Sequence, residues 1–298
     1  MQNRALVLGG GGVTGVAWEI GLLAGLAELG IDLAAADMII GTSAGSLVGA
    51  EVASGESLES LYQGQLAPPD GQASARMGLM NTARLVWIMI GTRNPDRARV
   101  KMGRLALAAR TESEASRRAV FEQRLAGRAW PDRLQITAVD ALTGAFTVFH
   151  AAGPATLTDA VGASCAVPGV WPPVTIGDRR YIDGGMRSPA NADHAGGYRR
   201  VVIIAPIAQG VGYMVSPVRQ AAELSKAGSS VVIVTPDAPA LKAIGRNVLD
   251  PARREPAARA GRAQAAAVAD QVRAIWLDGY EAEAKADAVP DQPAEPTG

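Results

Sequence analysis

The stretch Met38-Ile39-Ile40-Gly41-Thr42-Ser43-Ala44-Gly45 decides the fold. A short apolar run enters a turn in which glycines flank a serine, and residues 44–53 then follow a helical pattern. This order of strand, turn and helix is the context of a nucleophile elbow, where the turn is too sharp for side chains beside the serine. The helix N-terminus would favour negative charge developing at the Ser43 hydroxyl. Because a Gly-x-Ser-x-Gly string also arises by chance, a glycine-rich turn with a helix-capping serine is the alternative.

The rest of the chain alternates strands and helices around this stretch. Short runs rich in β-branched residues predict strands at Ala5–Leu8, Met38–Ile40, Leu134–Val139, Phe146–His150, Val201–Ala205 and Val231–Thr235. Helical patterns occupy Val16–Leu29, Ala44–Ala53, Leu157–Ser164 and Pro217–Ala227. This alternation indicates an α/β fold, a three-layer α/β/α sandwich in which helices cover both faces of a mostly parallel central sheet.

Two segments stand outside the alternation. Residues 55–132 form a long insertion with helical patterns and no clear strand, and insertions of this kind often form lids. Residues 256–277 predict an Ala- and Arg-rich helix, and residues 279–298 are acidic and contain prolines, which is typical of a disordered tail. We therefore expect one domain over residues 1–278.

Composition excludes several classes of function. The 29 basic and 29 acidic side chains cancel, so no net field attracts nucleic acid. The single cysteine, Cys165, rules out an internal disulfide framework and a multi-cysteine metal site, which fits a reducing compartment. The sequence shows neither a signal-peptide pattern nor a run of about 20 apolar residues. We expect a cytoplasmic protein, at most peripheral to a membrane, that uses no metal and no cofactor.

A glycine run follows the first predicted strand. Gly10, Gly11 and Gly12, with Gly9 before them and Gly15 after, open the first helix, so their backbone amides can converge on an anion. Such amides would suit an oxyanion hole, which stabilises the tetrahedral state of acyl transfer. The same glycines match a dinucleotide-binding fingerprint, which is the alternative. That motif needs an acidic residue at the end of the second strand, whereas the second predicted strand runs directly into the elbow.

An aspartate turn supplies the candidate base. Asp183 follows Tyr181-Ile182 and precedes two glycines, a setting in which an aspartate is commonly only a turn former. Of the two histidines, His194 would give the order Ser, Asp, His of an α/β-hydrolase triad. That fold places several strands before its nucleophile, whereas Ser43 follows the second strand, and His194 has the polar surroundings of a surface loop. His150 ends a predicted strand, where a capping or partly buried role suits it.

Together these residues resemble the patatin-like phospholipases, which are lipid acyl hydrolases with a Ser/Asp dyad and no catalytic histidine. The resemblance covers residues 5–53 and 162–191 and, more loosely, the strands between and after them. Gly10–Gly15 looks like the oxyanion loop of the family, Gly41–Gly45 like its elbow and Asp183–Gly185 like its aspartate turn. One departure is Thr14, at a position where members often carry an arginine, which removes a cation from the anion site.

The resemblance implies a dyad in which Asp183, partly desolvated, takes the proton of Ser43 as Ser43 attacks an ester carbonyl. It implies a lipid or ester substrate and an activity of the phospholipase A, lysophospholipase or carboxylesterase type. Apolar residues of the insertion, with Met80 and Trp87 as candidates, could line an acyl groove or make transient contact with a membrane surface, and a core helix is the alternative. A lipid-binding protein without catalysis is a competing class, although both dyad residues are present.

Overall fold

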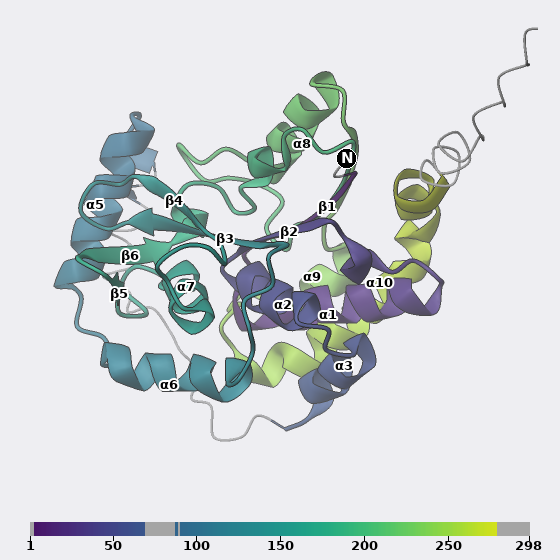
Figure 1. Cartoon of the computed structure of the whole chain (residues 1–298), viewed down its shortest axis with the longest axis horizontal. Coiled ribbons are helices and arrows are strands. Elements are labelled where there is room, and N and C mark those ends of the chain that lie inside the picture. Colours follow the sequence, from purple (N-terminus) through teal and green to yellow (C-terminus); the bar gives the residue numbers. More distant parts are fainter. Residues whose placement is uncertain (1–2, 69–86, 89, 279–298) are drawn as a thin grey trace, which may run out of the picture.

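The structure is a computed structural model that describes residues 3–68, 87–88 and 90–278. The described residues form an eight-stranded sheet (Figure 1). Five neighbouring strands, in the order β3-β2-β1-β7-β8, are parallel, while β4 and β6 pair antiparallel with β3, and β5 pairs antiparallel with β6. The strands are β1 (Arg4–Leu8), β2 (Met38–Thr42), β3 (Leu134–Asp140), β4 (Phe146–Phe149), β5 (Val174–Ile176), β6 (Arg179–Asp183), β7 (Arg200–Ile204) and β8 (Ser230–Val234).

Two helical layers enclose this sheet, so the expected α/β/α sandwich is confirmed. Figure 1 shows α8 on one side of the sheet and α1, α2 and α10 on the other. The helices are α1 (Gly12–Glu28), α2 (Ala44–Ala53), α3 (Leu58–Leu66), α5 (Pro95–Ala108), α6 (Glu114–Leu125), α7 (Leu157–Ser164), α8 (Pro217–Lys226), α9 (Ala238–Ile244) and α10 (Arg254–Arg273).

Most residues of the central strands are apolar because both faces of these strands are buried. In β1, Leu6 and Leu8 belong to the core cluster beneath α1 and α2, whereas Ala5 and Val7 belong to the cluster beneath α8. Successive side chains of a strand point to opposite faces, so a strand covered twice reads as a continuous apolar run. The predicted strands agree with the observed ones to within two residues at each end, and β5 and β6 were not predicted as strands.

The pairing of β3 brings two distant segments together. β2 pairs with β3 as far as Thr42 opposite Thr137, and β6 pairs with β3 from Asp183 opposite Ala138. β4 pairs with residues 136–139 of β3 and therefore occupies the other edge. Because β2 is parallel and β6 antiparallel to β3, the two strands run toward each other along one edge. Their carboxyl ends meet there.

Described helices of the insertion are part of the core. Tyr62 of α3 and Phe121 of α6 are buried in the cluster that contains α1, and Met102 of α5 is buried with Ile182 of β6. The remainder of the insertion, residues 69–86 and 89, and the predicted tail at 279–298 lie outside the described residues. Within the described part of the chain, every helix is too short or too polar to cross a membrane.

Candidate active site

The elbow around Ser43 is a strained turn between β2 and α2. Ser43 has φ 53° and ψ −116°, a conformation that side chains rarely adopt and that is typical of functional sites. Glycine is required beside it, because a Cβ atom at Gly45 would lie 2.1 Å from the backbone oxygen of Leu8. The Ser43 side chain is buried apart from 8% of its surface and stands before the first turn of α2. The sequence motif thus folds into the predicted strand, turn and helix.

The hydroxyl of Ser43 donates a hydrogen bond directly to Asp183. The distance from Ser43 Oγ to Asp183 Oδ2 is 2.7 Å, and the two residues are 140 positions apart in the chain. The other carboxylate oxygen, Oδ1, accepts a hydrogen bond of 2.7 Å from the backbone amide of Gly185. Asp183 is 3% exposed. These two residues meet because β2 and β6 end face to face on the edge of β3.

Burial changes the acidity of this carboxyl group. It raises the pKa of Asp183 from 3.8 to about 7, because the charged form loses its hydration. The bonds from the Ser43 hydroxyl and the Gly185 amide favour the charged form and oppose that rise. An aspartate with this pKa is a much better proton acceptor for a hydroxyl than an exposed aspartate, and it still ionises at neutral pH.

Groups behind the elbow hold the backbone of Ser43. Its amide donates to Ser164 Oγ at 2.8 Å, and its carbonyl oxygen accepts bonds from Ser46 Oγ at 2.7 Å and Cys165 Sγ at 3.2 Å. Burial raises the pKa of Cys165 to about 12, so this thiol stays protonated at neutral pH and is unsuited to be a nucleophile. Sequence reasoning did not assign a role to Ser164, because its partner lies 121 positions away.

The glycine loop lies against Ser43. A Cβ atom at Gly10 would be 3.4 Å from Ser43 Cβ, so the loop backbone approaches Ser43 closely. The amide of Gly10 donates to Pro189 O at 2.7 Å and is therefore already engaged. Gly11 caps α1 and Gly12 begins it, and amides at that position have no acceptor within their own helix. Gly12 has φ 63°, and a Cβ there would lie 2.7 Å from Val248 O.

Thr14 has a structural explanation. It is fully buried, and both its amide, at 3.0 Å, and its hydroxyl, at 3.3 Å, donate to Val248 O. The segment around Val248 therefore covers the first turn of α1. A long cationic side chain at position 14 would have to displace it.

The remaining predicted residues are His194, Trp87 and Met80. The ring of His194 packs against Phe146 with centroids 4.9 Å apart, and burial lowers the pKa of His194. Trp87 is 72% exposed, while its neighbour Ile88 packs into the cluster that contains Ile182 of β6. Met80 lies outside the described residues.

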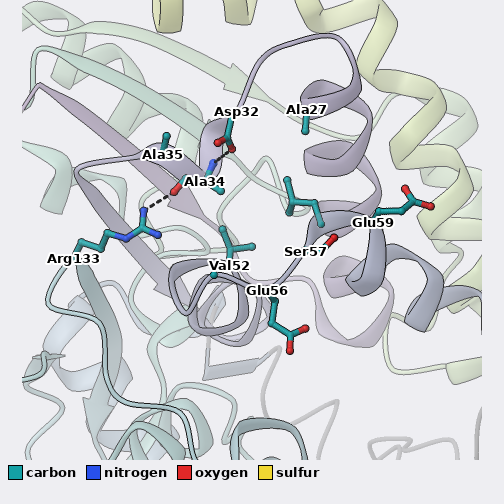
Figure 2. A pocket seen from close by; sticks show the side chains of 11 residues that line it. Ala27, Asp32, Ala34, Ala35, Val52, Glu56, Ser57, Glu59 and Arg133 are labelled. Carbon is teal, nitrogen blue, oxygen red and sulfur yellow. Dashed lines mark hydrogen bonds between the residues drawn. The ribbon is translucent and has the colours of Figure 1, made fainter.

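A pocket of about 530 Å³ lies at the C-terminal end of α2, whereas Ser43 precedes the N-terminal end. Figure 2 shows the residues that line it. Its lining includes Val52, Glu56 and Arg133, and Arg133 donates to the Ala34 carbonyl oxygen there. A helix of ten residues is about 15 Å long, so this pocket is separate from the dyad. Among the residues that the structure describes, no group of three or more His, Cys, Asp and Glu side chains could hold a metal ion.

The chain is similar to known proteins in two comparisons, one of structures and one of sequence families. The chain is similar to VipD from Legionella pneumophila, at 12% identity and a TM-score of 0.45 over 91% of this chain and 67% of that one. It is similar to the type III effector protein ExoU, at 16% identity and a TM-score of 0.42 over 93% and 54%. Similarities this low carry no information about activity, and no curated protein matches the chain. The model of the patatin-like phospholipases matches residues 6–195, which is more than half of the chain and includes Ser43 and Asp183; the protein therefore belongs to that family.

Proposed function

We propose that the protein is a serine lipid acyl hydrolase of the phospholipase A, lysophospholipase or carboxylesterase type, in which Ser43 is the nucleophile and Asp183 the general base. The observation that carries the proposal is the 2.7 Å hydrogen bond from Ser43 Oγ to Asp183 Oδ2 inside a buried elbow. A direct contact between nucleophile and base leaves no place for an intervening histidine. Family membership supports lipid ester hydrolysis as the reaction class.

The reaction would run in two halves. Ser43 Oγ forms a bond to the ester carbonyl carbon while Asp183 takes the hydroxyl proton, and the carbonyl oxygen becomes an oxyanion. Asp183 then gives this proton to the departing alcohol oxygen, which leaves an acyl group on Ser43. In the second half a water molecule loses a proton to Asp183 and attacks the acyl carbon. The carboxylic acid leaves as Ser43 recovers the proton.

The oxyanion would be held at the first turn of α1. Because the Gly10 amide is bonded to Pro189 O, we assign the donors to the amides of Gly11 and Gly12, with Gly10 shaping the wall beside Ser43. The positive end of the α1 dipole adds to this stabilisation. No cation is needed at Thr14, so the backbone alone would supply the donors.

The test is hydrolysis of a medium-chain p-nitrophenyl ester by the wild type, Ser43→Ala, Asp183→Asn and His194→Ala, with circular dichroism as the folding control. We expect the first two variants to lose turnover and His194→Ala to keep it. Loss of activity in His194→Ala as well as in Ser43→Ala would favour an α/β-hydrolase triad instead. A fluorophosphonate probe that fails to label Ser43 would favour a lipid-binding protein without catalysis, and a thermal shift with a dinucleotide would favour a nucleotide site.

Substrate contacts are the second part of the proposal. The exposed indole of Trp87 suits contact with an acyl chain or a transient contact with a lipid surface, because Trp prefers the boundary between apolar and polar phases. We expect Trp87→Ala to weaken hydrolysis of lipid in vesicles more than hydrolysis of a soluble short-chain ester. Mass spectrometry of the fatty acids released from a mixed lipid extract would identify the substrate.

A further inference from the structure

Asn191 lies fully buried beneath the dyad in a strained conformation. Its backbone has φ 51° and ψ 37°, the left-handed region, which costs a residue with a side chain about 1 kcal/mol or more. Asparagine tolerates this region better than other such residues. We therefore ask which contacts of the Asn191 side chain offset this strain.

The side-chain amide of Asn191 makes an unusual number of contacts. Its nitrogen, Nδ2, lies 3.1 Å from Gly184 O, 3.0 Å from Ser188 O, 3.1 Å from Thr42 Oγ1 and 3.3 Å from Thr137 Oγ1. Two of these groups are carbonyl oxygens, which can only accept, so the NH2 end of the amide must face them. The amide oxygen accepts a bond of 2.9 Å from Arg187 Nη1, which agrees with that orientation.

These contacts connect the two halves of the dyad. Thr42 is the residue before Ser43, and Gly184 is the residue after Asp183. The carboxyl ends of β2 and β6 meet end to end on β3, so no ladder of strand hydrogen bonds can run between them. The Asn191 amide spans that junction. The same segment also holds the oxyanion loop, through the bond from the Gly10 amide to Pro189 O.

We propose that Asn191 is a positioning residue for the dyad: its side-chain amide bridges Thr42 and Gly184 and so keeps Ser43 Oγ within hydrogen-bonding distance of Asp183. The inference rests on the proposed function, since it concerns the same two reactive residues. Its left-handed backbone is the conformation that lets one side chain reach both strand ends. A displacement of about 1 Å between reacting groups can cost a hundredfold in rate, so such a bridge has a measurable consequence.

Two substitutions separate the amide from the backbone conformation. Glycine adopts the left-handed region without strain, so Asn191→Gly keeps the backbone and removes only the amide. Asn191→Asp keeps the shape and the tolerance for that region but presents an acceptor to the carbonyl oxygens of Gly184 and Ser188, which can only accept. Asn94→Gly is the matched control, because Asn94 is an exposed cap of α5, far from the dyad in the sequence.

Kinetics of ester hydrolysis provide the readouts. We expect kcat to fall about 10- to 100-fold in Asn191→Gly and Asn191→Asp with KM nearly unchanged, and to stay at the wild-type value in Asn94→Gly. The pH profile gives a second signature. The bond from Ser43 lowers the pKa of Asp183, so loosening it should move the midpoint of the profile to higher pH. A loss of stability alone would leave that midpoint in place.

Each outcome supports or overturns the proposal. Wild-type kcat and midpoint in Asn191→Gly would show that the amide does not position the dyad. If Asn191→Gly does not fold, Thr42→Val removes one of the bridged acceptors, and it must show the same fall in kcat and shift in midpoint. Ser43→Ala measured in parallel separates the two hypotheses. If the wild type hydrolyses the ester no faster than Ser43→Ala, the proposed function fails, and this inference fails with it. If the wild type is active and Asn191→Gly has the same kcat and midpoint, only the inference is overturned.

Discussion

The raised pKa of Asp183 predicts a steep dependence of activity on pH. A general base acts only when it is ionised, and burial places the pKa of Asp183 at about 7. Below that value the ionised fraction falls tenfold for each pH unit. We expect kcat/KM at pH 6 to be about a tenth of its plateau and at pH 5 about a hundredth. An ordinary aspartate, with a pKa near 3.8, would leave the rate level between pH 5 and pH 8.

The assay follows a p-nitrophenyl ester at a concentration well below KM between pH 5 and pH 9. Samples are quenched and brought to alkaline pH before the phenol is read, so that its own ionisation does not distort the profile. Ser43→Ala gives the background of spontaneous hydrolysis, and circular dichroism at each pH shows that the fold persists. A level rate from pH 5 to pH 8 would refute the assignment of a buried base at Asp183.

The same shift predicts a dependence of stability on pH, with a definite sign. The folded state holds the Asp183 proton more tightly than the unfolded state, so its contribution to stability is fully present below about pH 3.8 and is lost as pH rises to about 7. A shift of about three units corresponds to roughly 4 kcal/mol at full ionisation. Asp183→Asn removes this cost. We expect the free energy of unfolding of Asp183→Asn, measured with urea, to increase relative to that of the wild type by roughly 2–3 kcal/mol between pH 5 and pH 8.

Three further predictions concern single substitutions. Ser164→Ala leaves the buried amide of Ser43 without its acceptor, and we expect urea unfolding to show a loss of about 1–3 kcal/mol together with a lower kcat. Gly45→Ala places a Cβ against a backbone oxygen of β1 and should prevent folding. Gly64 lies on α3 with open space around it, so Gly64→Ala should increase the free energy of unfolding by about 0.5–1 kcal/mol and raise the melting temperature slightly. Glu19 is fully buried, and burial raises its pKa well above 4.5 against the opposing effect of a backbone hydrogen bond with Gly9, so wild-type stability should fall as pH rises from about 4.5. Glu19→Gln should therefore equal the wild type near pH 4 and exceed it at pH 9 in urea unfolding, and equal stability at both pH values would contradict this account.

The sequence predicted the central strands better than the strands at the edge. A strand buried on both faces is composed mainly of apolar residues, so the sequences of β1 and β7 after their first residue are continuous apolar runs. β6 instead begins with two arginines whose side chains reach the surface, and β5 has three residues. Their strand conformation depends on pairing with β3 and with each other, which a local pattern does not record.

The candidate site was recognisable as separate motifs but not as an arrangement. The elbow and the aspartate turn carry local signatures, because glycines are needed where backbone approaches backbone. Nothing in the residues near Ser43 indicates that β2 ends opposite β6, since that contact arises through β3. Asn191 lacks a local signature altogether. Its role depends on four partners from three parts of the chain, and the sequence shows only one asparagine in a polar loop.

The chemistry of the site follows from how few groups stabilise the charge on Asp183. Its carboxylate receives one bond from Ser43 and one from the Gly185 amide, and among the described residues no lysine or arginine bonds to it. A cation there would lower the pKa of Asp183, leaving more of the base ionised but making it a weaker acceptor for the serine proton. Complete removal of donors would raise the pKa further and leave little ionised base at neutral pH. Two neutral donors in a buried pocket hold the pKa near 7, where a carboxylate is both a useful base and substantially ionised at neutral pH, as the proposed dyad requires in the absence of a histidine.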